Sequence, residues 1–190
     1  MSDVEEHLPF VACGGAAAIL VSEDFAKKNN VDLNVKIISQ SMTTDYESTF
    51  AENDMMQLVG YDMSREAARN VCEDSAVDIK DIDVVELHDC FATAEMLHYE
   101  NLGLCKDGEA GKMIDEGHVE LGGKVPVNVS GGLLSKGHPL GATGIANIYE
   151  ICTHLRGEAG KRQVEGAKIG MTHVIGLGTA CGIHILEKPS

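Results

Sequence analysis

The chain is poor in aromatic and basic side chains. Tryptophan is absent, and aromatic residues make up 4% of the 190 residues. The 15 lysines and arginines are outnumbered by 30 aspartates and glutamates, which gives a formal net charge of −15. Nucleic-acid backbones attract positively charged surfaces, so this balance argues against a nucleic-acid partner. Solubility is the plain explanation of the acidic surface.

Long apolar runs and targeting signals are also lacking. No stretch approaches the roughly 18 apolar residues of a transmembrane helix, so no membrane span is expected. Residues 1–9 are acidic and do not resemble a signal peptide, and residues 187–190 are not a peroxisomal address of the SKL type. We expect an intracellular protein, either cytoplasmic or peroxisomal or mitochondrial, with no targeting signal in this chain.

The six cysteines form no Cys-x-x-Cys pair. Without a signal peptide, this spacing favours reduced thiols over a disulfide framework. A zinc site needs paired Cys or His ligands at short spacings, and no second pair is present. We therefore expect no metal.

Hydrophobic residues make up 44% of the chain, which excludes wholesale disorder, and apolar segments of strand and helix type alternate. This alternation predicts an α/β fold with a mixed sheet. The helix after Gly141 is apolar on most sides, which predicts burial between layers. The expected strands are 16–21, 35–38, 82–87, 125–129, 168–174 and 181–186, and the expected helices are 23–28, 64–77, 91–102, 109–116 and the stretch after Gly141.

Two short motifs carry the chemistry. The sequence HDCF at 88–91 places an imidazole, a carboxylate and a thiol directly after an apolar strand. The sequence GHPLGATG at 137–144 places a histidine in a glycine-rich turn before the apolar helix. Thiol and imidazole groups serve acyl transfer, and a helix start offers free N–H groups to negative charge.

These motifs, in this order, resemble the thiolase family. HDCF is similar to the version in sterol-carrier-protein-type thiolases, and GHPLGATG is similar to the histidine loop of the family. The resemblance extends to residues 14–21 and 175–185. It implies a thiolase-like fold, with 46–190 as the C-terminal α/β domain, helices on both faces of a mixed sheet, and 1–45 as the remnant of the N-terminal domain.

The resemblance assigns roles to the first motif. Cys90 would be the proton-shuttling acid/base, and its place at a helix start predicts a lowered thiol pKa. His88 would help to form an oxyanion hole for the thioester carbonyl. The alternatives are a core cysteine and a structural histidine. Asp89 is expected to cap a helix rather than to take part.

In the second motif, the resemblance gives His138 two tasks: it activates a nucleophilic cysteine and holds the substrate oxyanion. An ordinary loop histidine is the alternative. Backbone approach to coenzyme A is expected at four glycines, and Ser135 lies just before the loop. The expected coenzyme-binding residues are Gly137, Gly141, Gly176, Gly178 and Ser135.

The C-terminal loop departs from most thiolases, which carry a Cys-x-Gly stretch there. Residues 173–178 contain no cysteine, so Cys90 would take over that task. Cys181 is expected to be a packing residue. His173 is expected either to line the pocket or to pack in the core, and both alternatives stay open. His98, His154 and His184 are expected at the surface or in packing.

Three functions remain open. The resemblance places the nucleophilic cysteine in a segment that should precede Met1. We therefore expect the chain to be a C-terminal half without its nucleophile. The first function is an acyltransferase of lipid metabolism and fatty acid β-oxidation, converting 3-ketoacyl-CoA and coenzyme A to acyl-CoA and acetyl-CoA. The others are a non-catalytic acyl-CoA-binding module and a scaffold for another thiolase-like or aldolase chain.

The same resemblance makes coenzyme A or acyl-CoA a substrate, with no covalently bound cofactor. A homo-oligomer or a complementary N-terminal thiolase half is the expected partner.

Overall fold

A mixed four-stranded sheet organises the molecule, and the computed structural model describes residues 12–51, 53–176 and 180–189 of the chain. The strand order is β1-β4-β3-β2. Strands β1 and β3 both pair antiparallel with β4, and β2 pairs parallel with β3. The bounds are β1 Lys36–Thr44, β2 Val84–Glu86, β3 Ile169–Gly176 and β4 Ala180–Glu187.

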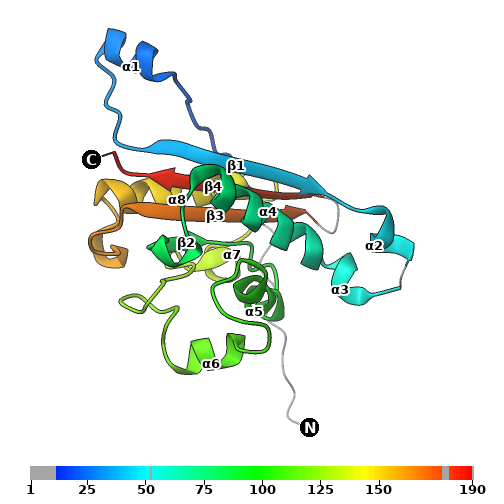
Figure 1. The fold of residues 1–190 in the computed structure, drawn as a ribbon. Coiled ribbons are helices and arrows are strands. Elements are labelled where there is room, and N and C mark those ends of the chain that lie inside the picture. Colours follow the sequence, from blue (N-terminus) through cyan, green and yellow to red (C-terminus); the bar gives the residue numbers. More distant parts are fainter. Residues whose placement is uncertain (1–11, 52, 177–179, 190) are drawn as a thin grey trace.

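Helices cover both faces of this sheet (Figure 1). Helix α4 packs on β1 and β4, and α8 packs across β3 and β2. Helix α5 lies against α4, and the short helix α7 immediately precedes the histidine loop. The α-helices are α1 Glu23–Asn29, α2 Glu47–Ala51, α3 Met55–Leu58, α4 Tyr61–Ser75, α5 Ala92–Asn101, α6 Ala110–Asp115, α7 Gly132–Lys136 and α8 Thr143–Arg156; two 3₁₀ turns are Ile79–Asp81 and Gly160–Arg162.

Two apolar clusters, one on each face, hold the layers together. Side chains alternate along a strand, so Val85 and Val84 on β2 enter different clusters. The larger cluster lies between the sheet and α4 and includes Val71 and Ile183, both fully buried. The smaller one is built around Ile151 of α8. Because both faces are apolar, the sheet has to be covered on both sides.

Most of the expected elements are present, with some differences. The expected strand 16–21 is wrong: residues 12–22 form no regular structure, since their backbone finds no partner strand among the described residues. The expected strand 125–129 is reduced to one bridge, between Val127 and Val85. Helices α2, α3 and α7 were not expected. The glycine turn expected between β3 and β4 falls on 177–179, outside the described residues.

The first strand of the sheet falls before the expected domain boundary at 45/46. Strand β1 pairs with β4 along its whole length, with a register shift between Ile37 and Ser39. The sheet therefore takes strands from both sides of that boundary. The division into 1–45 and 46–190 stays a prediction.

Helix α8 is covered on more than one side. Seven of its fourteen residues are buried, including Ile151 and Leu155 against the sheet, whereas Tyr149 is 66% exposed. Away from the sheet, Arg162 Nε donates to Glu150 Oε1 at 2.8 Å and Val164 N–H donates to His154 Nδ1 at 3.1 Å. The expected burial of this helix between layers stays a prediction. Across the residues that the structure describes, no helix combines the length and apolar character that crossing a membrane requires.

The contact between β3 and α8 leaves no room for a side chain at Gly170. A Cβ there would overlap Ile151 and press on Val84. Gly170→Ala should lower the free energy of unfolding by about 1–3 kcal/mol through overpacking. Urea unfolding monitored by circular dichroism measures this change.

Gly182→Ala on β4 is the matched control, since a Cβ at Gly182 meets nothing within 4 Å. Its effect should stay within about 0.5 kcal/mol. Equal losses in the two variants would contradict the close packing of β3 on α8.

Candidate active site

The end of strand β2 carries the first motif into contact with the segment before the histidine loop. The β2 backbone is held by Pro126 and Asn128: Val85 N–H donates to Pro126 O at 3.0 Å, and Leu87 N–H donates to Asn128 Oδ1 at 2.8 Å. Glu86 is the last residue of β2, and His88 follows it by two positions. Both side chains are buried.

Asp89 forms the first of two carboxylate contacts to this segment. It is 2% exposed, and its side chain accepts from Leu133 N–H at 2.7 Å and from Leu134 N–H at 3.4 Å. The expected helix cap is therefore present, but on α7 rather than on the helix that follows the motif. Gly132 makes room for it, because a Cβ there would overlap the Asp89 carboxylate. The φ of +59° at Gly132 also favours glycine.

Glu86 forms the second contact. Its fully buried carboxylate accepts from Ser130 N–H at 3.2 Å, from Ser130 Oγ at 2.7 Å and from Lys136 Nζ at 3.2 Å. Lys136 Nζ also donates to Ser130 Oγ at 2.8 Å. Burial raises the pKa of Glu86, against the opposing effect of Lys136 and Ser130. We call Glu86, Asp89 and these partners in 130–136 the carboxylate clamp.

The clamp places two imidazoles edge to face. The ring centroids of His88 and His138 lie 4.9 Å apart at an interplanar angle of 83°. The rings come from segments 50 residues apart in the sequence and are 7% and 8% exposed. The structure thus brings together two of the three expected catalytic residues in one partly closed site.

Both imidazoles are neutral at pH 7. Burial lowers the pKa of His88 to about 4, and the nearby His138 adds to this effect. Burial also lowers the pKa of His138, while the carboxylate of Asp89 acts in the opposite direction. A neutral imidazole has one N–H donor and one lone pair, so each ring can both hold an oxyanion and take up a proton.

His138 has a fixed partner in its own motif. Its Nδ1 lies 2.7 Å from Thr143 Oγ1, and Thr143 is the first residue of α8. Because Nδ1 is occupied, Nε2 is the nitrogen left for chemistry.

Cys90 follows Asp89 directly and is half-buried. Burial raises the pKa of its thiol, as does Asp89, and these effects outweigh the backbone N–H groups of Cys90 and Phe91. The expected lowering of this pKa is therefore wrong: desolvation is larger than the effect of the helix start. At pH 7 Cys90 is a thiol, which can give a proton.

Four of the five expected coenzyme-binding residues lie within the described part of the chain. Gly137 has a φ of +90° and ends α7, and Ser135 is exposed on that helix. A Cβ at Gly141 would meet nothing within 4 Å, so the protein itself does not require glycine there. Gly176 is the last residue of β3, and Gly178 lies outside the described residues. Their contact with a coenzyme stays a prediction.

Two further histidines form a buried pair. The rings of His98 and His173 are 4.3 Å apart, and His173 Nε2 lies 3.4 Å from Ser64 Oγ. His173 is fully buried, so the alternative that it lines a pocket is wrong and it is a packing residue. Burial lowers the pKa of His98 to about 3. Cys181 is fully buried, as expected of a packing residue.

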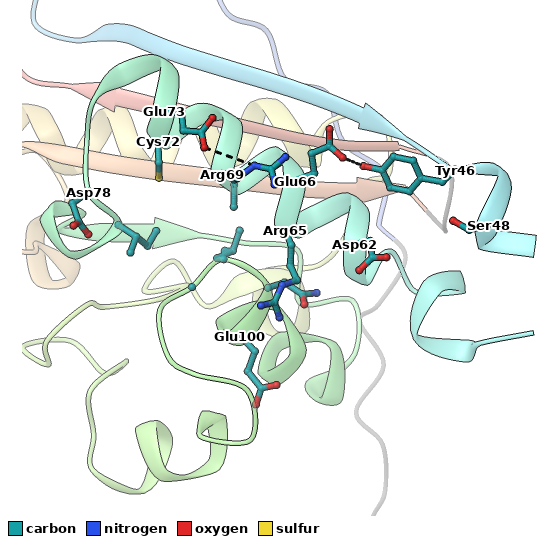
Figure 2. Close-up of a pocket in the computed structure, with 15 residues that line it drawn as sticks. Tyr46, Ser48, Asp62, Arg65, Glu66, Arg69, Cys72, Glu73, Asp78 and Glu100 are labelled. Carbon is teal, nitrogen blue, oxygen red and sulfur yellow. Dashed lines mark hydrogen bonds and ion pairs between the residues drawn. The ribbon is translucent and has the colours of Figure 1, made fainter. Parts of the chain in front are cut away.

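A large hollow among the described residues lies elsewhere. It measures about 900 Å³ and lies along the outer side of α4 (Figure 2). None of the three expected catalytic residues lines it. Its charged side chains already have partners: Glu66 accepts from the Tyr46 hydroxyl, and Arg69 pairs with Glu73 at 3.8 Å. Over the part of the chain that the structure describes, no three His, Cys, Asp or Glu side chains are arranged as metal ligands.

Sequence reasoning missed Glu86 and Thr143. A charged residue between Val85 and Leu87 in an apolar run is itself a signal, since a buried carboxylate needs partners. For Thr143, a hydroxyl that opens a helix five residues after the histidine gives a weaker signal. Neither position identifies its partner.

The structure is an α/β domain with a pair of buried imidazoles near the end of a strand. The pattern of the thiolase C-terminal domain-like family matches residues 44–188. The chain therefore belongs to the thiolase family, and it matches the C-terminal domain.

Known proteins resemble the chain over most of its length. Sterol carrier protein 2 of Rattus norvegicus is 55% identical over 168 residues, which cover 88% of this chain and 31% of that protein. The acetyl-CoA acetyltransferase of Methanothermobacter thermautotrophicus is 43% identical over 180 residues, covering 94% and 46%. The solved Ltp2-ChsH2(DUF35) aldolase shares the fold, with a TM-score of 0.71 at 23% identity over 81% of this chain and 39% of its own. The chain thus spans about a third of the length of the rat relative.

The raised pKa of Cys90 can be tested by alkylation. Less thiolate is present at pH 7 than for an ordinary cysteine, so iodoacetamide should modify Cys90 several-fold more slowly than the exposed Cys13. The Cys90 rate should continue to rise with pH beyond about 8.5, the ordinary thiol value. Peptide mass spectrometry measures both sites in one sample. A Cys90 rate that is fast at pH 7 and constant above pH 8 would contradict this account.

Proposed function

We propose that the chain supplies the acid/base half of a thiolase-type acyltransferase, which converts 3-ketoacyl-CoA and coenzyme A to acyl-CoA and acetyl-CoA. The observation that carries the proposal is the edge-to-face pair of His88 and His138, together with the Cys90 thiol, which follows His88 by two residues and is protonated at pH 7. Membership of the thiolase family and the likeness to an acetyl-CoA acetyltransferase support it.

In the first half-reaction, a cysteine thiolate attacks the keto carbon of the substrate. This nucleophile comes from the N-terminal half of a thiolase, and His138 Nε2 accepts its proton. The bond between the keto carbon and the α-carbon breaks and leaves an acyl-enzyme and the enolate of acetyl-CoA. The imidazole N–H of His88 and the Nε2–H that His138 has gained from the nucleophile stabilise the oxygen on which charge develops.

Cys90 then completes the proton balance. Its thiol gives a proton to the enolate carbon, which releases acetyl-CoA and leaves Cys90 as a thiolate. The Cys90 thiolate next takes the proton of the incoming coenzyme A. The coenzyme thiolate attacks the acyl-enzyme, forms acyl-CoA and restores the nucleophile. A raised thiol pKa suits this sequence, because Cys90 begins as an acid and not as a nucleophile.

Asp89 supports the charge that forms on His138. Its buried carboxylate favours the imidazolium of His138 and disfavours the thiolate of Cys90. The Asp89 carboxylate thus favours proton uptake by His138 and keeps the proton on Cys90, as the first half-reaction needs.

A second candidate is a non-catalytic acyl-CoA-binding or scaffold module that partners another thiolase-like or aldolase chain. Exposed apolar side chains favour a partner, since Ile19 is 92% exposed, Leu20 is 77% exposed and Phe50 is 66% exposed. A complementary thiolase half or a second copy of the chain would serve as that partner.

Complementation separates the two functions. The chain is mixed with a separately produced N-terminal half of a thiolase, and thiolysis of a 3-ketoacyl-CoA is followed by loss of the ketoacyl absorbance. We expect turnover in the mixture and a loss of about 10²–10⁴-fold with Cys90→Ala, the range for removal of a general acid/base.

Cys72→Ala is the matched control and should leave the rate nearly unchanged, because Cys72 is half-buried like Cys90 and lines the hollow along α4, away from the three expected catalytic residues. Near-normal turnover with Cys90→Ala would remove Cys90 from the mechanism. A folded complex that binds acyl-CoA without turnover would favour the scaffold function. Turnover by the chain alone would mean that it carries its own nucleophile.

A further inference from the structure

We propose that Thr143 is a positioning residue that fixes the tautomer of His138, with the proton on Nδ1 and the lone pair on Nε2. The proposal deepens the proposed function, since it decides which nitrogen of His138 acts as the base. The evidence is a chain of three groups, His138 Nδ1, Thr143 Oγ1 and Pro139 O, joined by contacts of 2.7 and 3.1 Å.

The argument depends on the single proton of the threonine hydroxyl. Thr143 Oγ1 donates to Pro139 O at 3.1 Å, the bond that a threonine makes to the carbonyl four residues earlier. A hydroxyl with its proton so engaged can only accept a second hydrogen bond. The 2.7 Å contact to His138 then requires N–H at Nδ1, and Nε2 is left without a proton.

The geometry around the hydroxyl is rigid. Thr143 is 2% exposed and opens α8, where a β-branched side chain has restricted rotation about χ1. The Pro139 carbonyl also accepts from Ala142 N–H at 2.8 Å and from Thr143 N–H at 3.0 Å. Two backbone N–H groups at the start of α8 and the Thr143 hydroxyl therefore point to the same oxygen, Pro139 O. This arrangement holds the hydroxyl in place.

This arrangement determines which nitrogen of His138 acts as the base. With Nδ1–H tied to Thr143, the free lone pair of His138 is at Nε2, the nitrogen that the proposed function uses to take the nucleophile's proton. When that proton arrives, both nitrogens carry protons, and the bond to Thr143 persists and strengthens. Loss of the hydroxyl should therefore also lower the pKa of His138.

Nitrogen-15 NMR of the histidine side chains reads the tautomer directly and requires no activity. The spectra correlate ring protons with Nδ1 and Nε2 in the purified chain at pH 7.5, and His138→Asn identifies the His138 signals. We expect wild type and Thr143→Ser to show the Nδ1–H tautomer. Thr143→Val, which removes the hydroxyl and keeps the shape, should show a mixture and a lower His138 pKa.

Thr153→Val is the matched control. Thr153 lies on the same helix and donates to Tyr149 O at 2.8 Å, the same kind of bond, in a largely buried position. Its removal should leave the His138 tautomer unchanged.

A wild-type chain with the proton on Nε2 would overturn the proposal, as would a Thr143→Val chain with the wild-type tautomer. The wild-type result stands even if Thr143→Val does not fold. These spectra are independent of thiolysis: a correct tautomer in a chain that gives no turnover with the N-terminal half refutes the proposed function and leaves the role of Thr143 intact.

Discussion

The candidate site depends on two buried carboxylates that connect the end of β2 to the segment before the histidine loop. Glu86 and Asp89 together accept from three backbone N–H groups, one hydroxyl and one ammonium group across this contact. A buried carboxylate is costly unless its oxygens are satisfied, so each contact can form only when the two segments are together. His88 lies between the two carboxylates in the sequence and is carried to His138 by the same contacts.

Burial sets the protonation states of His88, His138 and Cys90. It keeps both imidazoles neutral, so each retains one donor and one lone pair, and it keeps Cys90 protonated. The charge of Asp89 favours a proton on His138 and opposes its loss from Cys90. In the proposed function, His138 accepts a proton and Cys90 gives one. That division is what a reaction through an enolate requires.

Local patterns predicted the elements well, and long-range contacts were beyond them. The apolar run 82–87, the helix cap at Ser22 and the period of α4 are encoded within a few residues of each position. The motifs also indicated Cys90, His88 and His138. The partners of Asp89 are backbone N–H groups 44 and 45 residues away, which no side-chain pattern marks. The Cys90 pKa was expected in the wrong direction because burial is a property of the packed chain.

The most direct measurement of the clamp is the distance between the His88 and His138 rings when one carboxylate is removed. Nuclear Overhauser contacts between the two imidazoles, recorded for wild type and Asp89→Ala, report it. We expect a contact in wild type and its loss in Asp89→Ala, while the amide spectrum of the sheet stays that of the folded protein. A contact of equal strength in both proteins would show that the imidazoles are held together without the Asp89 part of the clamp, and would contradict its role.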